Sequence, residues 1–380
     1  MARLLGDLKP VYVVGIGFHP YQYPTDTPYV TLGLQAVREA LVDAGVQWAD
    51  VESSYISTAL LGMAVGRPLL RHLGAHGQPL VHVENASASG STAFRHACIE
   101  VGAGISDIAL VLGIDKRPDG PIPRASTAIP ALAADAVVPF THFALLADEY
   151  AAQHGIDPRD LALVAVKNHG NGAKNPNAQR QKARTLDEVL GGRPISGTLT
   201  ALQCTPVGEG AAAVIVASED GIKRLGIDAG RAIRVASSAA GSETAGNSLN
   251  PDTGLSTEIM MRAMAEASVA PCELDVVELH DAFTVEELLY AEATGVCAPG
   301  EFISLLKEGA FDIGGRCAIS PSGGLIAMGH PIGPTGVGQI GEIVRQLRGE
   351  AGERQHKGAR TGLAHMVGVG AVCYVHVLQN

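Results

Sequence analysis

The sequence lacks the features that mark disulfide-linked, metal-binding and membrane-spanning proteins. Its six cysteines are scattered, with no CxxC pair and no His/Cys cluster at metal-ligand spacing, so neither a disulfide framework nor a metal site is expected. No stretch approaches the ~20 apolar residues that span a bilayer, and the opening MARLLGDLKPVYVV has no long apolar run. These absences predict a cytoplasmic protein with free thiols, no metal and no membrane contact.

An excess of basic residues is also missing. The formal net charge is −11, whereas binding to a phosphate backbone needs a basic face. The charge therefore argues against a nucleic-acid partner. Any anionic ligand has to find a local basic patch.

Hydrophobic residues and glycines are plentiful, and they indicate a compact α/β protein. The chain has 380 residues, 46% of them hydrophobic, and 46 glycines, which suits many tight strand-to-helix turns. Short apolar runs alternate with helical periodicity from Pro10 to Asp115, and the same order begins again near Arg231. This pattern predicts two similar halves with a mostly parallel sheet. The loop-rich stretch between them, which ends near Thr205, is interpreted as an insertion.

Three glycine-rich junctions between a strand and a helix are candidates for chemistry. The first, ENASASGS at 84–91, could hold a small nucleophile at a tight elbow beside the positive end of a helix. A serine-rich helix cap explains the same segment equally well. The other two deliver histidines, His280 in HDAF and His330 in PSGGLIAMGHP. Two histidines on loops that face an elbow would supply proton transfer and hydrogen-bond donors.

The motifs resemble those of the thiolase superfamily, in the style of sterol-carrier-type thiolases and bacterial thiolase-like subunits that act with a small partner. They are VENASASGSTA, VKNHGNGAKNPNAQ, CTPVGEGAAAVIV, HDAF, PSGGLIAMGHPIGPTG and HMVGVGAV, in family order over nearly the whole chain. The resemblance implies an α/β thiolase fold, with two βαβαβαββ halves stacked together. It divides the chain into an N-terminal half (1–118, completed by about 206–228), an inserted loop domain (119–205) and a C-terminal half (229–380).

The resemblance also implies roles for individual residues. Ser87 occupies the position of the nucleophilic cysteine, and His330 matches the histidine that activates it. His280 contributes with His330 to one oxyanion hole. The backbone N–H of Gly368 joins that of residue 87 in a second hole.

None of the three positions where the family places a cysteine carries one in this sequence. Residue 87 is serine, Ala282 replaces the cysteine of the HDCF motif, and Met366 replaces the acid/base cysteine. A thiolate is a good nucleophile at neutral pH, whereas a serine hydroxyl needs a strong general base. Either cysteine is natural at 87 and an inactivating substitution has removed it, or the protein has abandoned acyl transfer. The missing second acid/base leaves His280, a water or the substrate to manage a proton.

A basic segment supplies candidates for contact with coenzyme A. The stretch 167–184 contains five cations and no acid, although a solvated charge run would look the same. In thiolases the inserted region covers the active site and carries much of the coenzyme A contact. The residues predicted to bind it are Lys167, Lys174, Arg180 and Lys182, together with Ser322 and Gly323 of the PSGG motif.

Three functions remain open. The first is a degradative thiolase that cleaves a 3-oxoacyl-CoA with coenzyme A as co-substrate, here as an inactive variant because of Ser87. The second is a retro-aldolase on a 3-hydroxyacyl-CoA, and the third is a non-catalytic subunit that binds acyl-CoA. The resemblance also implies a homodimer and a separate zinc-ribbon/OB-fold partner subunit.

Overall fold

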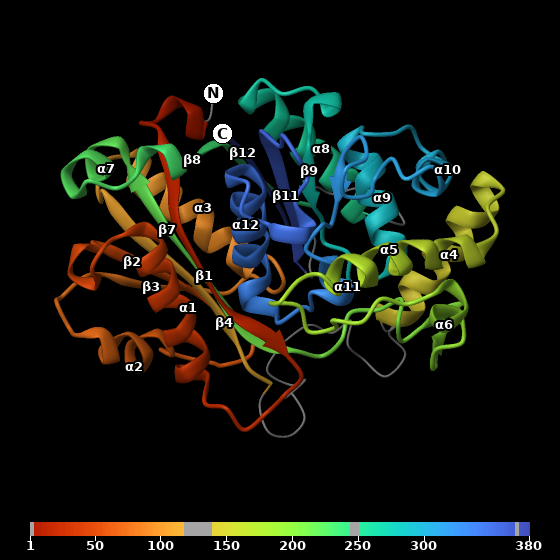
Figure 1. The fold of residues 1–380 in the computed structure, drawn as a ribbon, viewed down its shortest axis with the longest axis horizontal. Coiled ribbons are helices and arrows are strands. Elements are labelled where there is room, and N and C mark those ends of the chain that lie inside the picture. Colours follow the sequence, from red (N-terminus) through yellow and green to blue (C-terminus); the bar gives the residue numbers. More distant parts are fainter. Residues whose placement is uncertain (1–3, 118–138, 244–250, 369–371) are drawn as a thin grey trace.

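The computed structural model describes residues 4–117, 139–243, 251–368 and 372–380. Its main sheet has ten strands and consists of two matching halves (Figure 1). From the centre outwards the strand order is β1-β7-β4-β2-β3 in one half and β8-β12-β11-β9-β10 in the other. Equivalent neighbours also run in equivalent directions. The predicted α/β architecture of two similar halves is confirmed.

The strands of the two halves have similar lengths at most equivalent positions. In the first half they are β1 (Val11–Gln22), β2 (Ser53–Ser57), β3 (Leu80–Val83), β4 (Ile108–Asp115) and β7 (Glu209–Ser218). In the second half they are β8 (Ile233–Ser242), β9 (Val276–Glu278), β10 (Ala318–Ile319), β11 (Thr361–Gly368) and β12 (Val372–Gln379). A separate hairpin consists of β5 (Pro194–Ser196) and β6 (Leu199–Thr200).

The prediction of a mostly parallel sheet was wrong. Only the three outer strands of each half are parallel, whereas β7 and β1, like β12 and β8, pair antiparallel. The halves meet through β1 and β8, which share only the pairs Tyr12↔Arg234 and Val13↔Ile233. The centre of the sheet is therefore antiparallel.

Helices cover both faces of each half and fill the space between the halves. They are α1 (Tyr29–Ala44), α2 (Gly66–Leu70), α3 (Ser89–Gly102), α4 (Pro139–His154), α5 (Ala162–Gly172), α6 (Leu186–Leu190), α7 (Glu219–Leu225), α8 (Pro251–Ala267), α9 (Thr284–Thr294), α10 (Phe302–Lys307), α11 (Gly324–Ala327) and α12 (Ile332–Arg348). Short 3-10 helices lie at Leu5–Asp7, Trp48–Asp50, Arg71–Leu73, Pro158–Leu161, Ala229–Arg231, Pro271–Glu273 and Gly352–Arg354. Among the described helices, none is long and apolar enough to cross a membrane.

The helices α3 and α12 form the middle layer (Figure 1). Glycines allow their backbones to touch, because a Cβ atom on Gly90 would lie 2.8 Å from the Gly333 carbonyl, and one on Gly336 would lie 2.6 Å from the Ser91 nitrogen. On the outside, α1 packs on β1 and β7, and α8 packs on β8 and β12. This arrangement stacks the halves as predicted. It also places the start of α3 beside the start of α12.

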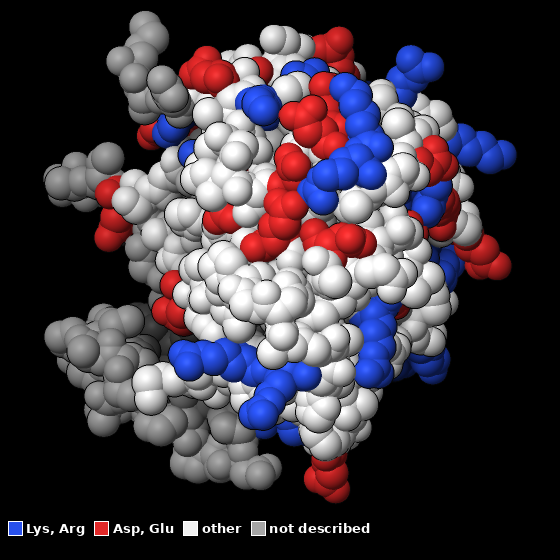
Figure 2. All heavy atoms as spheres, turned by 90° about the vertical axis from the view of Figure 1, so that its left-hand side faces the viewer, with Lys and Arg blue, Asp and Glu red and all other residues white. Residues whose placement is uncertain are grey.

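The inserted region packs against the second half. Its residues Tyr150, Leu161 and Val189 share one hydrophobic core with Leu279 and Phe283 of the second half. The start of the predicted insertion, 119–138, lies outside the described residues, and the domain boundaries stay a prediction. On the outer side of the first half, cations and carboxylates are interspersed (Figure 2).

Candidate active site

Ser87 lies on a strained elbow between β3 and α3. The preceding Ala86 has φ of 48°, a left-handed conformation that is costly for a residue with a side chain. The Ser89 hydroxyl secures the turn, because it donates to the Ala86 carbonyl at 2.6 Å and accepts from the Asn85 nitrogen at 2.8 Å. The N-cap of α3 is Ala88, without a side-chain bond, so Ser87 does not cap the helix. Its hydroxyl is left for another partner.

That partner is His330. The Ser87 Oγ lies 3.0 Å from His330 Nε2, and His330 Nδ1 lies 2.8 Å from Thr335 Oγ1. The Thr335 hydroxyl donates its only hydrogen to the Pro331 carbonyl at 2.6 Å, so it accepts from Nδ1. This chain of bonds assigns the ring proton to Nδ1 and leaves Nε2 as the acceptor of the Ser87 hydrogen. Burial, and then the nearby His280, hold the pKa of His330 well below its ordinary value, which keeps the ring neutral.

His280 lies edge to face with His330, at 5.4 Å between ring centroids. Its Nδ1 lies 3.1 Å from Oε1 of Glu286. A carboxylate accepts only, so Nδ1 carries a proton. Within the described part of the chain, the buried Nε2 has no hydrogen-bond partner. The two histidines predicted from different motifs therefore meet, each with its inner nitrogen held.

Gly368 also reaches the elbow. A Cβ atom at this position would lie 2.6 Å from the Asn85 carbonyl and 3.3 Å from the Ala88 Cβ. No side chain fits there. Glycine is needed at the end of β11 for the strand to approach the elbow this closely.

Asp115 ties the two halves together at the site. Its buried carboxylate accepts from the backbone nitrogens of Ala59, Leu60 and Gly333, the last at 2.6 Å, and from the Thr58 hydroxyl at 2.6 Å. Gly333 follows His330 by three residues. A carboxylate of the first half thus fixes the loop that carries the histidine of the second.

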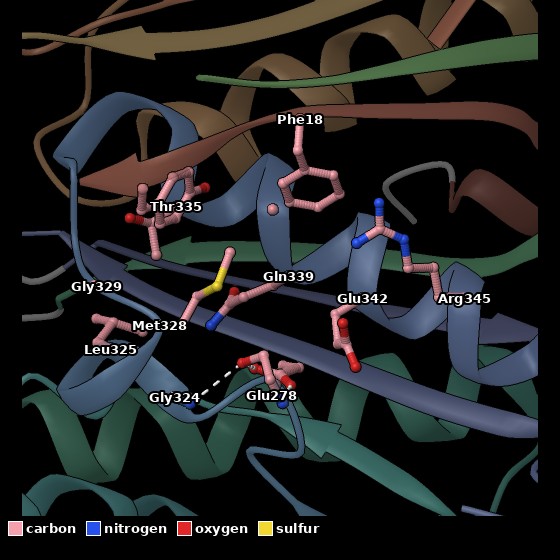
Figure 3. Close-up of a pocket in the computed structure, with 13 residues that line it drawn as sticks. Phe18, Glu278, Gly324, Leu325, Met328, Gly329, Thr335, Gln339, Glu342 and Arg345 are labelled. Carbon is pink, nitrogen blue, oxygen red and sulfur yellow. Dashed lines mark hydrogen bonds between the residues drawn. The ribbon is translucent and has the colours of Figure 1, made fainter. Parts of the chain in front are cut away.

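Ser322 and Gly323 lie on the loop before α11. The Ser322 nitrogen and hydroxyl donate to the buried Glu278 carboxylate at 2.9 and 2.8 Å. Burial, and then the nearby Glu342 charge, raise the pKa of Glu278 to about 8. Beside Glu278 is a cavity of about 10 Å³, room for about one water; β1, β9 and α12 contribute to its lining (Figure 3).

Two of the predicted coenzyme A ligands are engaged inside the protein. Lys167 Nζ lies 2.6 Å from the Ile319 carbonyl and 3.0 Å from Glu287. The Arg180 guanidinium donates to three carbonyls, those of Cys204, Ile326 and Ala201. Both cations tie the insertion to the second half, Lys167 through Ile319 and Glu287 and Arg180 through Ile326.

Lys174 and Lys182, by contrast, are exposed. Lys182 lies 3.6 Å from Glu188, an exposed pair that contributes little to stability. Both ammonium groups are accessible to an anionic ligand. The structure therefore separates the four predicted cations into an internal pair and a surface pair.

The structure offers no thiol at the three positions where thiolases carry one. Ala282 and Met366 are buried, and Ser87 faces His330 with a hydroxyl. The five buried cysteines have raised pKa values, because burial disfavours the thiolate. The sixth, Cys272, is exposed.

Sequence reasoning missed Glu286, Thr335 and Asp115. Glu286 stands six residues after His280, and Thr335 stands five after His330. Each is one helical turn into the helix that follows its histidine. That spacing is a usable signal, because a side chain on the first turn can reach back to the loop before the helix.

Comparisons with known proteins identify the family of the chain. Residues 21–191 match the family described as thiolase, N-terminal domain, and residues 255–380 match the thiolase C-terminal domain-like family. The chain is 34% identical to the chicken (Gallus gallus) sterol carrier protein 2 over 389 residues, covering 97% of this chain and 71% of that protein. It is 32% identical to the benzoylsuccinyl-CoA thiolase subunit BbsB of Thauera aromatica, covering 95% of both.

Solved structures share the fold. A structure described as an Ltp2-ChsH2(DUF35) aldolase superposes with a TM-score of 0.83 at 23% identity, covering 97% of both chains. Human mitochondrial 3-ketoacyl-CoA thiolase superposes with a TM-score of 0.74 at 19% identity, covering 100% of both chains. The predicted thiolase fold is confirmed. With two domain matches and relatives above 30% identity along nearly its whole length, the chain belongs to the thiolase family.

Proposed function

We propose that this chain is an enzyme that breaks the Cα–Cβ bond of an acyl-CoA thioester by retro-aldol cleavage of a 3-hydroxyacyl-CoA. One observation carries the proposal: a neutral His330 presents Nε2 as a proton acceptor 3.0 Å from a hydroxyl, not from a thiol. An acceptor that binds a hydroxyl in this way suits the removal of a proton from a substrate hydroxyl. Retro-aldol cleavage needs no covalent acyl-enzyme.

The reaction balances with a base and a stabilised enolate. His330 Nε2 takes the proton of the 3-hydroxyl group, the C3–O electrons form a carbonyl, and the Cα–Cβ bond breaks. Its electron pair becomes the enolate of the shorter acyl-CoA, which regains a proton at Cα. The backbone N–H groups of residues 87 and 368 are proposed to stabilise the thioester oxygen. The products are an aldehyde or ketone and a shortened acyl-CoA, and no free coenzyme A is consumed.

Thiolytic cleavage is the second candidate, favoured by the position of Ser87. A cysteine at this elbow would lie beside His330 as a nucleophile beside its base, and BbsB is named as a thiolase subunit. In this candidate residue 87 attacks the keto carbon of a 3-oxoacyl-CoA, and coenzyme A accepts the acyl group. The serine form would be inactive, because a serine ester does not exchange readily with a thiol. A non-catalytic acyl-CoA-binding subunit is the least supported, since it has no use for two held histidines.

Coenzyme A is proposed to lie along the insertion. Lys174 and Lys182 supply accessible cations, and the Ser322–Gly323 loop approaches the catalytic end. We assign Lys167 and Arg180 a supporting role, because their charges are already paired inside the protein. The proposal includes a homodimer in the cytoplasm and a separate partner subunit, in line with the aldolase neighbour, whose description joins Ltp2 to ChsH2.

The test compares the protein with its Ser87→Cys variant on two substrate panels. A retro-aldolase releases aldehyde or ketone from 3-hydroxyacyl-CoA esters with the serine form and leaves added coenzyme A unconsumed. A thiolase consumes coenzyme A with 3-oxoacyl-CoA esters, and only with cysteine. Binding of acyl-CoA without turnover by either form, in the presence of any partner subunit, would overturn both reactions and leave the binding role.

A further inference from the structure

We propose that Glu286 is the positioning residue that makes His280 the acid of this site, so that a Glu286–His280 pair takes the place of the missing acid/base thiol. The inference rests on the proposed function for its reaction, but its geometry stands on the described residues alone. Neither residue 282 nor residue 366 can transfer a proton, since one is alanine and the other methionine. The unpartnered Nε2 of His280 can.

Two hydrogen bonds orient the Glu286 carboxylate, which also interacts with the hydroxyl of Tyr290 on the same helix. Its Oε1 faces His280 Nδ1 at 3.1 Å, and its Oε2 accepts from the Phe283 nitrogen at 3.0 Å, which caps α9. The residue is 1% exposed. Because the second bond anchors the carboxylate to the helix start, the first bond fixes the orientation of the imidazole.

Charge pairing distinguishes Glu286 from its neighbour Glu287. Glu287 lies 3.0 Å from the Lys167 ammonium. Glu286 has no Lys or Arg partner among the ion pairs of the described residues, and its one basic partner is His280. A buried carboxylate is costly unless a cation or hydrogen bonds compensate it. His280 supplies that cation when both ring nitrogens carry protons, and Nε2 then becomes a donor aimed away from Glu286.

Other ionisable groups near His280 come from three further elements. Asp252 on α8 has a raised pKa, first through burial and then through the Glu286 charge, while His280 opposes that rise. His365 on β11 and His330 both have lowered pKa values, through burial and then through His280. None of these three groups makes a hydrogen bond to the His280 ring in the described structure, whereas Glu286 does. It is therefore the residue that sets the proton on Nδ1.

The resulting step closes the retro-aldol cycle. His330 Nε2 has accepted the 3-hydroxyl proton, and the enolate of the shortened acyl-CoA carries an electron pair at Cα. The protonated His280 donates its Nε2 hydrogen to Cα, the new C–H bond forms, and His280 becomes neutral with its proton kept on Nδ1. One proton has entered at His330 and one has left from His280. Return of the accepted proton from His330 to His280, whose rings lie edge to face, restores the starting state.

The test replaces Glu286 by Gln and uses Glu292→Gln as the matched control. Both carboxylates lie on α9 and accept hydrogen bonds, but Glu292 bonds to Tyr150 and to the Gly300 nitrogen, not to a histidine. The first readout is nitrogen NMR of labelled histidine, with the His280 signal assigned from a His280→Gln variant. We expect the proton on Nδ1 in the neutral ring of the parent protein and of the control, and its loss from Nδ1 in Glu286→Gln.

The second readout is the effect on kcat and KM for cleavage. Removal of the carboxylate should lower kcat about 100-fold, the loss expected when a general acid is no longer held in position, with KM little changed, while the control keeps the parent values. A neutral His280 with its proton on Nε2 in the parent protein would overturn the pair, even if Glu286→Gln failed to fold. An unchanged tautomer together with an unchanged kcat in Glu286→Gln would also overturn it. The tautomer is measured without substrate, so a failure of the retro-aldol assignment is seen separately as absent cleavage.

Discussion

His330 and His280 meet edge to face, yet opposite kinds of group hold their inner nitrogens. A threonine hydroxyl, itself committed to a carbonyl, accepts from His330, whereas a buried carboxylate accepts from His280. A hydroxyl acceptor orients an imidazole ring without adding a charge beside it. A carboxylate acceptor orients the ring and also places a negative charge beside it. Two copies of one side chain can therefore serve as acceptor and donor in the same site, because their second contacts differ.

Removal of the proton acceptor, His330, is the strongest test of the different roles proposed for the two histidines. We expect His330→Ala to lower kcat for cleavage about 1000-fold, the middle of the range for a general base. Steady-state assays of aldehyde or ketone release measure this loss. The exposed His96 provides the control, and His96→Ala should keep the parent rate. A parent-like rate in His330→Ala would mean that His280 can act alone.

Replacement of Thr335 separates orientation from chemistry. Thr335→Val keeps the shape of the side chain but removes the acceptor for His330 Nδ1, so the ring proton can move to Nε2 and block the acceptor. We expect kcat to fall about 10- to 100-fold. Thr335→Ser keeps the hydroxyl and should stay near the parent rate. Equal losses in the two variants would point to helix packing as the cause.

Removal of the Ser87 hydroxyl should have a smaller effect. Retro-aldol cleavage needs His330 but no nucleophile, so Ser87→Ala should stay within about tenfold of the parent, about 1.4 kcal/mol in the barrier. Release of aldehyde or ketone from a 3-hydroxyacyl-CoA measures it. A loss as large as that of His330→Ala would show that the serine takes part in covalent chemistry.

The smallest expected effect is that of mild acid. Burial and His280 place the pKa of His330 well below its ordinary value of 6.5, and the proposed base must be neutral. The neutral form is then retained as pH falls through 6.5, and kcat/KM should change by less than about twofold between pH 7.5 and 6.5. The measurement is a pH–rate profile at constant ionic strength. A midpoint near 6.5 would mean that His330 is not the group that must be neutral.

Periodicity in the sequence predicted the order of strands and helices in both halves, but not strand direction. The apolar runs at β7 and β12 look like those of the other strands, although both pair antiparallel with their neighbours. Nothing in a buried apolar run encodes which way it points relative to a partner far away in the chain. The antiparallel centre of the sheet could therefore not be predicted from the sequence.

At the site, the histidines were predicted and the groups that hold them were not. His280 and His330 stand in motifs, whereas Glu286 and Thr335 act through contacts that appear only when loop and helix are placed in space. For the basic segment, too, the sequence did not show which cations are paired inside the protein. A run of cations does not reveal that Lys167 is buried against Glu287 while Lys182 remains in solvent.

The close glycine contact between α3 and α12 determines how far apart Ser87 and His330 lie. Ser87 stands two residues before α3 begins, and His330 stands two residues before α12. The distance at which these helices touch thus sets the gap between the hydroxyl and the imidazole. A methyl group at Gly336 would have to push the Ser91 backbone away, and the same displacement would widen that gap. A substitution buried between α3 and α12 would therefore disturb the proposed catalytic pair without touching either of its residues.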